Sequence, residues 1–189
     1  MNELKEIIDK YFHLREESFN EIDRVTEYRE YLPGDCFIEK GKRNHYEYFI
    51  IEGICRSYLI NSEGEEITIS FFDPKSVLSP FISRTINGIS TLYYQALTDL
   101  KVGIIDSSIF EKLLVENPEI REFGNMVLKM ELQKKIEKEI QMASLTAKER
   151  LIKFREQYHM LENLIPHPTI ATYLGITNVS LSRLRRDLS

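Results

Sequence analysis

The sequence is poor in the residues that build metal and redox centres. It has two cysteines and four histidines in 189 residues. Cys36 and Cys55 are isolated and lack CxxC spacing, whereas an iron–sulfur cluster needs about four cysteine ligands. Only His45 falls among the predicted strands, too few histidines for a metal centre inside a β-roll. We therefore predict two free thiols, no metal and no cofactor.

Long apolar runs and catalytic motifs are also missing. No apolar stretch is long enough to cross a bilayer, and the charged first six residues do not form a signal peptide. With two unpaired cysteines, this predicts a cytoplasmic protein without a membrane partner. P-loop, GxSxG and Rossmann glycine patterns are absent. We predict no catalytic residues and no enzyme activity.

A net positive charge is found only in the C-terminal segment, because acidic residues outnumber basic ones in the rest of the chain. The net charge is −5. Residues 144–189 contain seven Lys and Arg against four Asp and Glu, a balance of +3, whereas residues 1–143 contain 18 against 26, a balance of −8. A polyanion responds to a local patch more than to the total charge. The C-terminal segment is therefore the candidate nucleic-acid-binding region.

Short apolar segments between residues 26 and 105 predict a β-roll. The strand Tyr48–Gly53 is strongly apolar, and turns such as Pro33-Gly34-Asp35 and Asn61-Ser-Glu-Gly64 separate its neighbours. Short strands at regular intervals are typical of a double-sheet jelly-roll. An amphipathic helix over residues 2–17 precedes them.

A long helix is predicted from Pro118 to about Ala143. About 25 residues span about 38 Å, which is more than one small roll needs. The helix either lies along the roll or forms a coiled coil between two chains, and we favour the dimer because an exposed apolar row needs a partner. Its apolar residues are Ile120, Phe123, Val127 and Met130, followed after a phase shift by Leu132, Ile136 and Ile140.

Residues 169–186 have the pattern of a helix-turn-helix. Gly175 suits a left-handed turn between two helices, and Thr177 can cap the second. Leu181 and Leu184 give that helix a buried face, whereas its other face is basic and amide-rich. Two packed helices with a solvated basic face would show a similar pattern. A helix-turn-helix places its second helix in the major groove of DNA.

Several motifs occur in a fixed order along the chain: Leu32-Pro-Gly34-Asp35, Gly41, Tyr48-Phe-Ile-Ile51-Glu-Gly53, Arg56, Ile170-Ala171, Leu174-Gly175 and Leu181-Ser182-Arg183-Leu184. With the long helix between them, they resemble the Crp-Fnr family of bacterial transcription regulators, particularly compact members from Bacteroidetes-type bacteria. The resemblance implies an α+β protein: a cyclic-nucleotide-binding-like sensor domain at residues 1–117 (a double-stranded β-helix, or jelly-roll), a dimerisation helix at 118–143 and an all-α helix-turn-helix domain at 144–189.

The resemblance also implies a DNA-binding surface. The family's base-reading arginine falls on Arg183, and arginine suits a bidentate contact with guanine. Asn178 falls where the family places a base or phosphate contact. Val179 replaces an acidic residue of some members, so the target sequence should differ. The predicted DNA-binding residues are His167, Thr169, Thr177, Asn178, Ser180, Ser182, Arg183 and Arg186.

The ligand segment departs from the family pattern. Members that bind cyclic AMP carry a Gly-Glu pair and an arginine there, but residues 77–92 have no Gly-Glu, and Ser90 or Thr91 stands at the arginine position. A buried phosphate without a cation is costly, so we do not expect cyclic AMP to bind. The candidate pocket for another, unknown small effector comprises Phe71, Ser79, Arg84, Ser90, Thr91 and Tyr93.

The predicted function is therefore a homodimeric, sequence-specific regulator of transcription. Its expected partners are a palindromic double-stranded DNA site, a second copy of the chain, a small effector and RNA polymerase. The alternative is a ligand-binding or interaction module with a vestigial DNA-binding domain, because the β-hairpin wing that usually flanks the family's helix-turn-helix is missing from the sequence.

Overall fold

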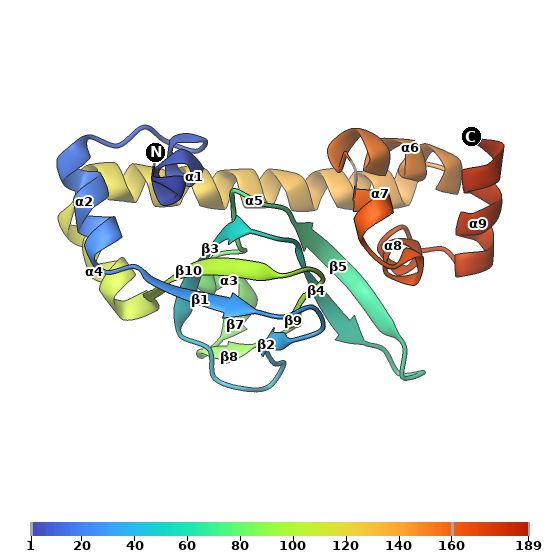
Figure 1. Ribbon diagram of the computed structural model, residues 1–189, viewed down its shortest axis with the longest axis horizontal. Coiled ribbons are helices and arrows are strands. Elements are labelled where there is room, and N and C mark those ends of the chain that lie inside the picture. The colour runs from blue at the N-terminus through green and yellow to red at the C-terminus, as the bar shows by residue number, and fades with distance from the viewer. Residues whose placement is uncertain (1, 160, 189) are drawn as a thin grey trace.

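The computed structural model describes residues 2–159 and 161–188. A β-roll lies beside one long helix, with the N-terminal helices at one end and the last four helices at the other (Figure 1). The helices are α1 (Glu3–Asp9), α2 (Glu16–Arg24), α3 (Phe81–Arg84), α4 (Ser107–Glu116), α5 (Pro118–Ser144), α6 (Ala147–Gln157), α7 (Leu161–Leu164), α8 (His167–Tyr173) and α9 (Asn178–Asp187).

Within those described ranges the roll has two four-stranded sheets, ordered β1-β10-β3-β6 and β2-β9-β4-β5. All their neighbouring strands are antiparallel. The α+β fold with an N-terminal roll is confirmed. The strands are β1 (Glu27–Tyr31), β2 (Cys36–Ile38), β3 (Tyr46–Glu52), β4 (Cys55–Ile60), β5 (Glu66–Phe72), β6 (Ser76–Val77), β7 (Thr85–Ile86), β8 (Ile89–Ser90), β9 (Tyr93–Ala96) and β10 (Leu100–Asp106).

Polar caps set the boundaries of the helices along one side. The Asp106 side chain accepts from the backbone at the start of α4, and Asn117 does the same for α5, which begins with Pro118. At the other end of α5, Thr146 and Glu149 form a capping box that starts α6. No helix in the described part of the chain is long and apolar enough to cross a membrane.

The first half of α5 belongs to the chain's own core. Ile120, Phe123 and Val127 are 0%, 1% and 6% exposed and pack with α1, α2 and the roll. The expectation that these three need a partner chain is therefore wrong, because the N-terminal helices cover them. The apolar side chains that stay exposed form another row, Leu128, Leu132, Ile136 and Ile140.

Strand β5 contributes to two cores. Phe72 points into the roll, where it packs with Tyr94, whereas Phe71 points outward and packs with the C-terminal helices. Neighbouring residues of a strand face opposite sides, so two consecutive buried phenylalanines require protein on both faces of β5. Helix α8 supplies the outer cover.

Candidate nucleic-acid interface and effector pocket

Helices α8 and α9 meet at a glycine turn. Gly175 has φ +66°, and the backbone N–H of Ile176 donates to the Ala171 carbonyl at 3.0 Å. Glycine adopts this left-handed conformation without a Cβ penalty. Thr177 then caps α9 by accepting the Ser180 N–H at 3.1 Å. The turn expected from the sequence is present, with Leu181 fully buried beneath it.

The outer face of α9 is open. Asn178, Ser182, Arg183 and Arg186 are all exposed, and Val179 beside them is 62% exposed. Among the residues that the structure describes, neither Arg183 nor Arg186 makes a hydrogen bond or ion pair with the protein. Both guanidinium groups can therefore contact a ligand without breaking an internal interaction.

Arg185 has a different role from its neighbours. Its Nε donates to Glu162 Oε1 at 2.6 Å, and its Nη1 lies 3.1 Å from His167 Nδ1. Arg155 donates twice to the same carboxylate, at 2.7 and 3.1 Å. These bonds, those of Arg155 first, lower the pKa of Glu162. The carboxylate thus ties α6, α7 and α9 together.

The remaining predicted DNA contacts are less open. His167 is half-buried beside Arg185, and Thr169 is 8% exposed on the inner side of α8. Thr177 and Ser180 use their side chains on each other, with the two hydroxyl oxygens 2.9 Å apart at the N-terminus of α9. The open part of the predicted surface is therefore α9 itself.

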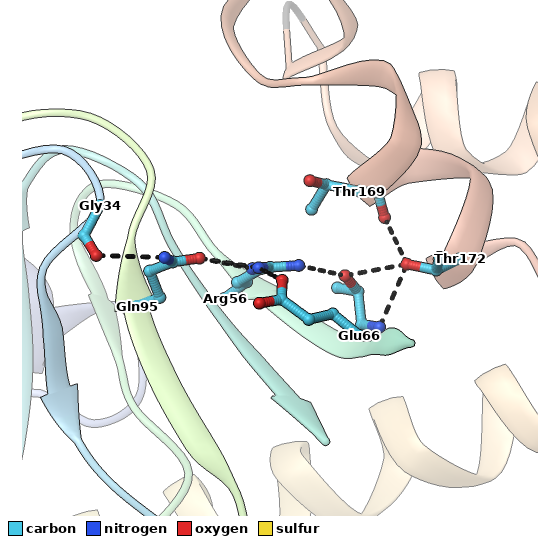
Figure 2. Close-up of polar contacts among 7 residues, drawn as sticks. Gly34, Arg56, Glu66, Gln95, Thr169 and Thr172 are labelled. Atoms are coloured by element: carbon cyan, nitrogen blue, oxygen red, sulfur yellow. Dashed lines mark hydrogen bonds and ion pairs between the residues drawn. The ribbon is translucent and has the colours of Figure 1, made fainter. Parts of the chain in front are cut away.

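A chain of polar contacts joins the roll to α8 (Figure 2). The Thr172 hydroxyl accepts the Thr68 N–H at 3.2 Å, and two acceptors lie in reach of its own proton: Thr68 Oγ1 at 3.2 Å and the Thr169 carbonyl at 3.1 Å. Arg56, which is 5% exposed, donates to Thr68 Oγ1 at 3.3 Å and pairs with Glu66.

Behind Arg56 the polar chain continues to the edge of the roll. Arg56 Nε and Nη2 donate to Gln95 Oε1 at 3.0 and 2.7 Å, and Gln95 Nε2 donates to the Gly34 carbonyl at 3.1 Å. The guanidinium therefore has partners on three sides, which offsets the cost of burying its charge.

Aromatic rings fill the seam beside these polar contacts. The Phe71 ring centroid lies 5.0 Å from that of Tyr173, 5.8 Å from Tyr158 and 5.9 Å from Phe154. Lys138 of α5 places its Nζ 3.7 Å from the Tyr173 ring centroid. Burial, then the nearby charge of Lys135, lowers the pKa of Lys138 to about 7. The roll, α5 and α8 therefore contact one another around Phe71, Lys138 and Tyr173.

The predicted effector residues do not surround one cavity. Phe71 lies on the outer face of β5, where it packs against the C-terminal helices. Ser90 and Thr91 donate to the carbonyls of Leu92 and Arg84, and Tyr93 stacks on Tyr58 with centroids 5.1 Å apart. Each of these side chains is engaged by the protein itself.

The two remaining pocket residues are buried. Arg84 is 1% exposed; its Nε donates to the Ser79 carbonyl at 3.1 Å, and its terminal nitrogens donate to Asn44 and to the Tyr46 carbonyl. The Ser79 hydroxyl donates to Glu131 of α5 at 2.5 Å. Burial lowers the pKa of Arg84, with the charge of Glu47 opposing that shift.

Comparison with known proteins places the roll. The family described as "Cyclic nucleotide-binding domain" matches residues 28–117. The matched residues run from β1 through α4. Among curated proteins, no sequence matches this chain.

Solved structures extend the likeness beyond the cyclic nucleotide-binding domain. FixK2 from Bradyrhizobium japonicum matches with a TM-score of 0.74 and 22% identity, covering 87% of this chain and 84% of its own. The c-di-GMP-responsive global regulator CLP from Xanthomonas campestris has a TM-score of 0.72 and 12% identity, with 92% and 91% covered. A crp/fnr-family regulator from Eubacterium rectale has a TM-score of 0.72 and 17% identity, with 92% and 82% covered. The Crp-Fnr-type fold expected from the sequence is confirmed.

Arg84 is the only Lys or Arg among residues 77–92, so it is the local cation that could face a ligand phosphate. Its donors already face Asn44, Tyr46 and Ser79. An incoming anion would have to displace those acceptors. The positions considered for the family's phosphate-binding arginine, Ser90 and Thr91, hold hydroxyls that donate to the backbone.

Two features of the site escaped the sequence analysis. The role of Glu162 depends on Arg155 and Arg185, which lie seven and 23 residues away in the chain, and no local spacing identifies that triad. The outward role of Phe71 had a signal, because two adjacent phenylalanines at the end of an alternating strand indicate burial on both faces.

Proposed function

We propose that this chain is a transcription regulator that binds DNA through α9. The observation that carries the proposal is the open face of α9, on which Arg183 and Arg186 are exposed and unpaired within the described residues. The likeness to Crp/Fnr-type regulators supports it. The glycine turn and the Arg185–Glu162 ion pair hold α9 in a fixed orientation, so the helix itself is positioned before DNA binds.

Roles differ along α9. Arg183 is the proposed base-reading residue, because a guanidinium can make two hydrogen bonds to guanine O6 and N7. Asn178 is the first residue of the helix, and we assign it a contact with a base or a phosphate. Arg186 is assigned to the phosphate backbone. Thr177, Ser180 and Ser182 are secondary contacts, and His167 acts through Arg185.

We further propose that the functional unit is a homodimer that pairs along α5. Leu128, Leu132, Ile136 and Ile140 are 41%, 61%, 47% and 58% exposed and recur every four residues, which places them in one row along the helix. Pairing two such rows buries them and sets two α9 helices on successive half-sites of a palindrome. Residues 1–117, 118–143 and 144–189 then serve sensing, pairing and DNA binding.

The effector is not expected to be cyclic AMP. The only guanidinium of residues 77–92 is buried and fully engaged by Asn44, Tyr46 and Ser79. RNA polymerase and an effector of another kind stay predicted partners.

The test of DNA binding starts with selection of sites from a random duplex library. On the selected site, Arg183→Ala should lose roughly 1–3 kcal/mol of binding and relax the preference at one base pair. Arg186→Ala is the matched control on the same helix. It should weaken binding to all DNA sequences alike, and it should reduce the slope of log affinity against log salt concentration by about one. If selection enriches no sequence, the chain is instead an interaction module with a vestigial DNA-binding domain.

The dimer has a separate test. Sedimentation of the full chain should give a dimer, and Leu132→Glu with Ile136→Glu should give a folded monomer with much weaker operator binding. Val115→Glu is the control, because Val115 is 71% exposed on α4, outside the proposed interface. A parent protein that sediments as a monomer at high concentration would refute the pairing.

A further inference from the structure

An apolar cavity lies outside the residues predicted for the effector. It is bounded by β3, α3, α4 and the first half of α5, and its volume is about 310 Å³. Its walls include Phe49, Phe81, Phe110, Leu114, Phe123 and Val127. Ile82, which is 74% exposed, lies at its mouth together with Leu128, the first residue of the row proposed to pair along α5.

The cavity is open to solvent at its mouth, so a small molecule can enter it. The wall atoms of an empty apolar pocket lack contacts on one side, and a bound apolar molecule would supply them. The walls are mostly aromatic and aliphatic, so water filling the cavity would find few hydrogen-bond partners. An engineered cavity of about 150 Å³ with such walls binds benzene, so a cavity about twice as large accommodates a two-ring molecule.

The Glu47 carboxylate is the polar group that could orient a ligand in this cavity. Glu47 of β3 lines it, and the carboxylate accepts the Phe81 N–H at 2.9 and 3.1 Å. Its side chain is half-buried, and burial raises the pKa of the carboxyl to about 7, while Arg84 and the Phe81 N–H oppose the rise. A carboxylate keeps about four lone-pair directions, so it can accept a further hydrogen bond from a molecule in the cavity.

The other charged groups of the cavity are placed differently. Glu111 of α4 and Arg121 of α5 line it but are exposed to solvent. Arg84 lies behind Glu47 and balances its charge, which disfavours a cationic ligand near the same carboxylate. A neutral hydrogen-bond donor fits these surroundings best.

We propose that this cavity binds a small, neutral, apolar molecule of about two rings that donates one hydrogen bond to Glu47. Such a ligand touches α3, α4 and α5 together, so it joins the roll to the long helix. The proposal does not depend on DNA binding, because its test measures ligand binding directly.

Indole and 1-methylindole form a matched pair of probes, since they share a two-ring body and only indole has an N–H donor. The chain has no tryptophan, so the indole fluorescence of either probe, excited to the red of tyrosine absorption, reports binding to the full-length protein without a tryptophan background. At pH 8, where Glu47 is mostly ionised, indole should bind saturably and 1-methylindole roughly tenfold more weakly, because the hydrogen bond to the charged acceptor is lost. This comparison uses the unaltered chain and needs no variant to fold.

Two variants locate the probe. Glu47→Gln keeps an acceptor oxygen for the Phe81 N–H and should shrink the difference between the two probes. Val127→Phe adds a ring to the cavity wall and should abolish binding of both, with circular dichroism to confirm the fold. The inference is overturned if neither probe saturates, if both bind equally well to the parent chain, or if Val127→Phe leaves binding unchanged. Binding that occurs in a monomeric fraction alone also overturns it, since a second copy would then occupy the cavity.

Discussion

A double-mutant cycle between Phe71 and Tyr173 tests whether the roll and the C-terminal helices are coupled. Their ring centroids lie 5.0 Å apart, and Phe71 is 5% exposed. Replacing either ring by leucine should cost about 1–2 kcal/mol of unfolding free energy. An aromatic pair contributes about 0.5–1.5 kcal/mol beyond burial of its area. We therefore expect Phe71→Leu and Tyr173→Leu to show a coupling energy of about 1 kcal/mol in urea denaturation.

The neighbouring strand residue provides the control for this cycle. Phe72 is 6% exposed, but it points into the roll and packs against Tyr94. Phe72→Leu should destabilise the chain by a similar amount and yet add independently to Tyr173→Leu, within about 0.3–0.5 kcal/mol. If the two cycles give the same coupling energy, the seam does not connect the two units, and the reasoning about β5 fails.

Three further predictions concern the backbone at Gly53, the ion pairs of Glu162 and the charge of Glu47. Gly53→Ala should unfold the roll, because the added Cβ would lie 2.0 Å from the Asp99 carbonyl oxygen. Gly64→Ala is the control: Gly64 has a similar positive φ but open space around it, so the substitution should cost only about 1 kcal/mol of unfolding free energy. Thermal denaturation of the two variants measures the difference. Glu162→Gln should leave the fold intact but weaken operator binding through a loosened Arg185, and an undiminished affinity would contradict the tie. The pKa of Glu47 rises from 4.5 to about 7 on folding, so the native state holds more protons in that window and stability falls as pH rises through it. Relative to the parent, Glu47→Gln should therefore gain up to about 3 kcal/mol between pH 4 and pH 8, and denaturation at both pH values measures it.

The sequence predicts the turns and helix caps of this protein well, because each depends on residues only a few positions apart. The Gly175 turn and the Thr177 cap are predicted from the sequence, and both are present. Each depends on a backbone conformation or a hydrogen bond to a near neighbour, so residue type and spacing determine it.

The remaining features depend on contacts across the chain. Which apolar row of α5 stays open is decided by α1 and α2, which cover Ile120 and Phe123. The predicted pocket residues do not surround one cavity, because Arg84 donates to the Tyr46 carbonyl on β3 and to Asn44 in the loop before it. Periodicity shows that a face is apolar, but it does not show which partner covers it.

The row of side chains that α5 turns toward the roll has one more consequence. Glu131 accepts from Ser79, Lys135 donates to Ser70 at 2.6 Å, and Lys138 donates to the Ile69 carbonyl. Spacings of four and three residues put these groups on a single side of one rigid cylinder. A slide or twist of the helix strains all three bonds together, so we expect them to break in concert rather than one at a time.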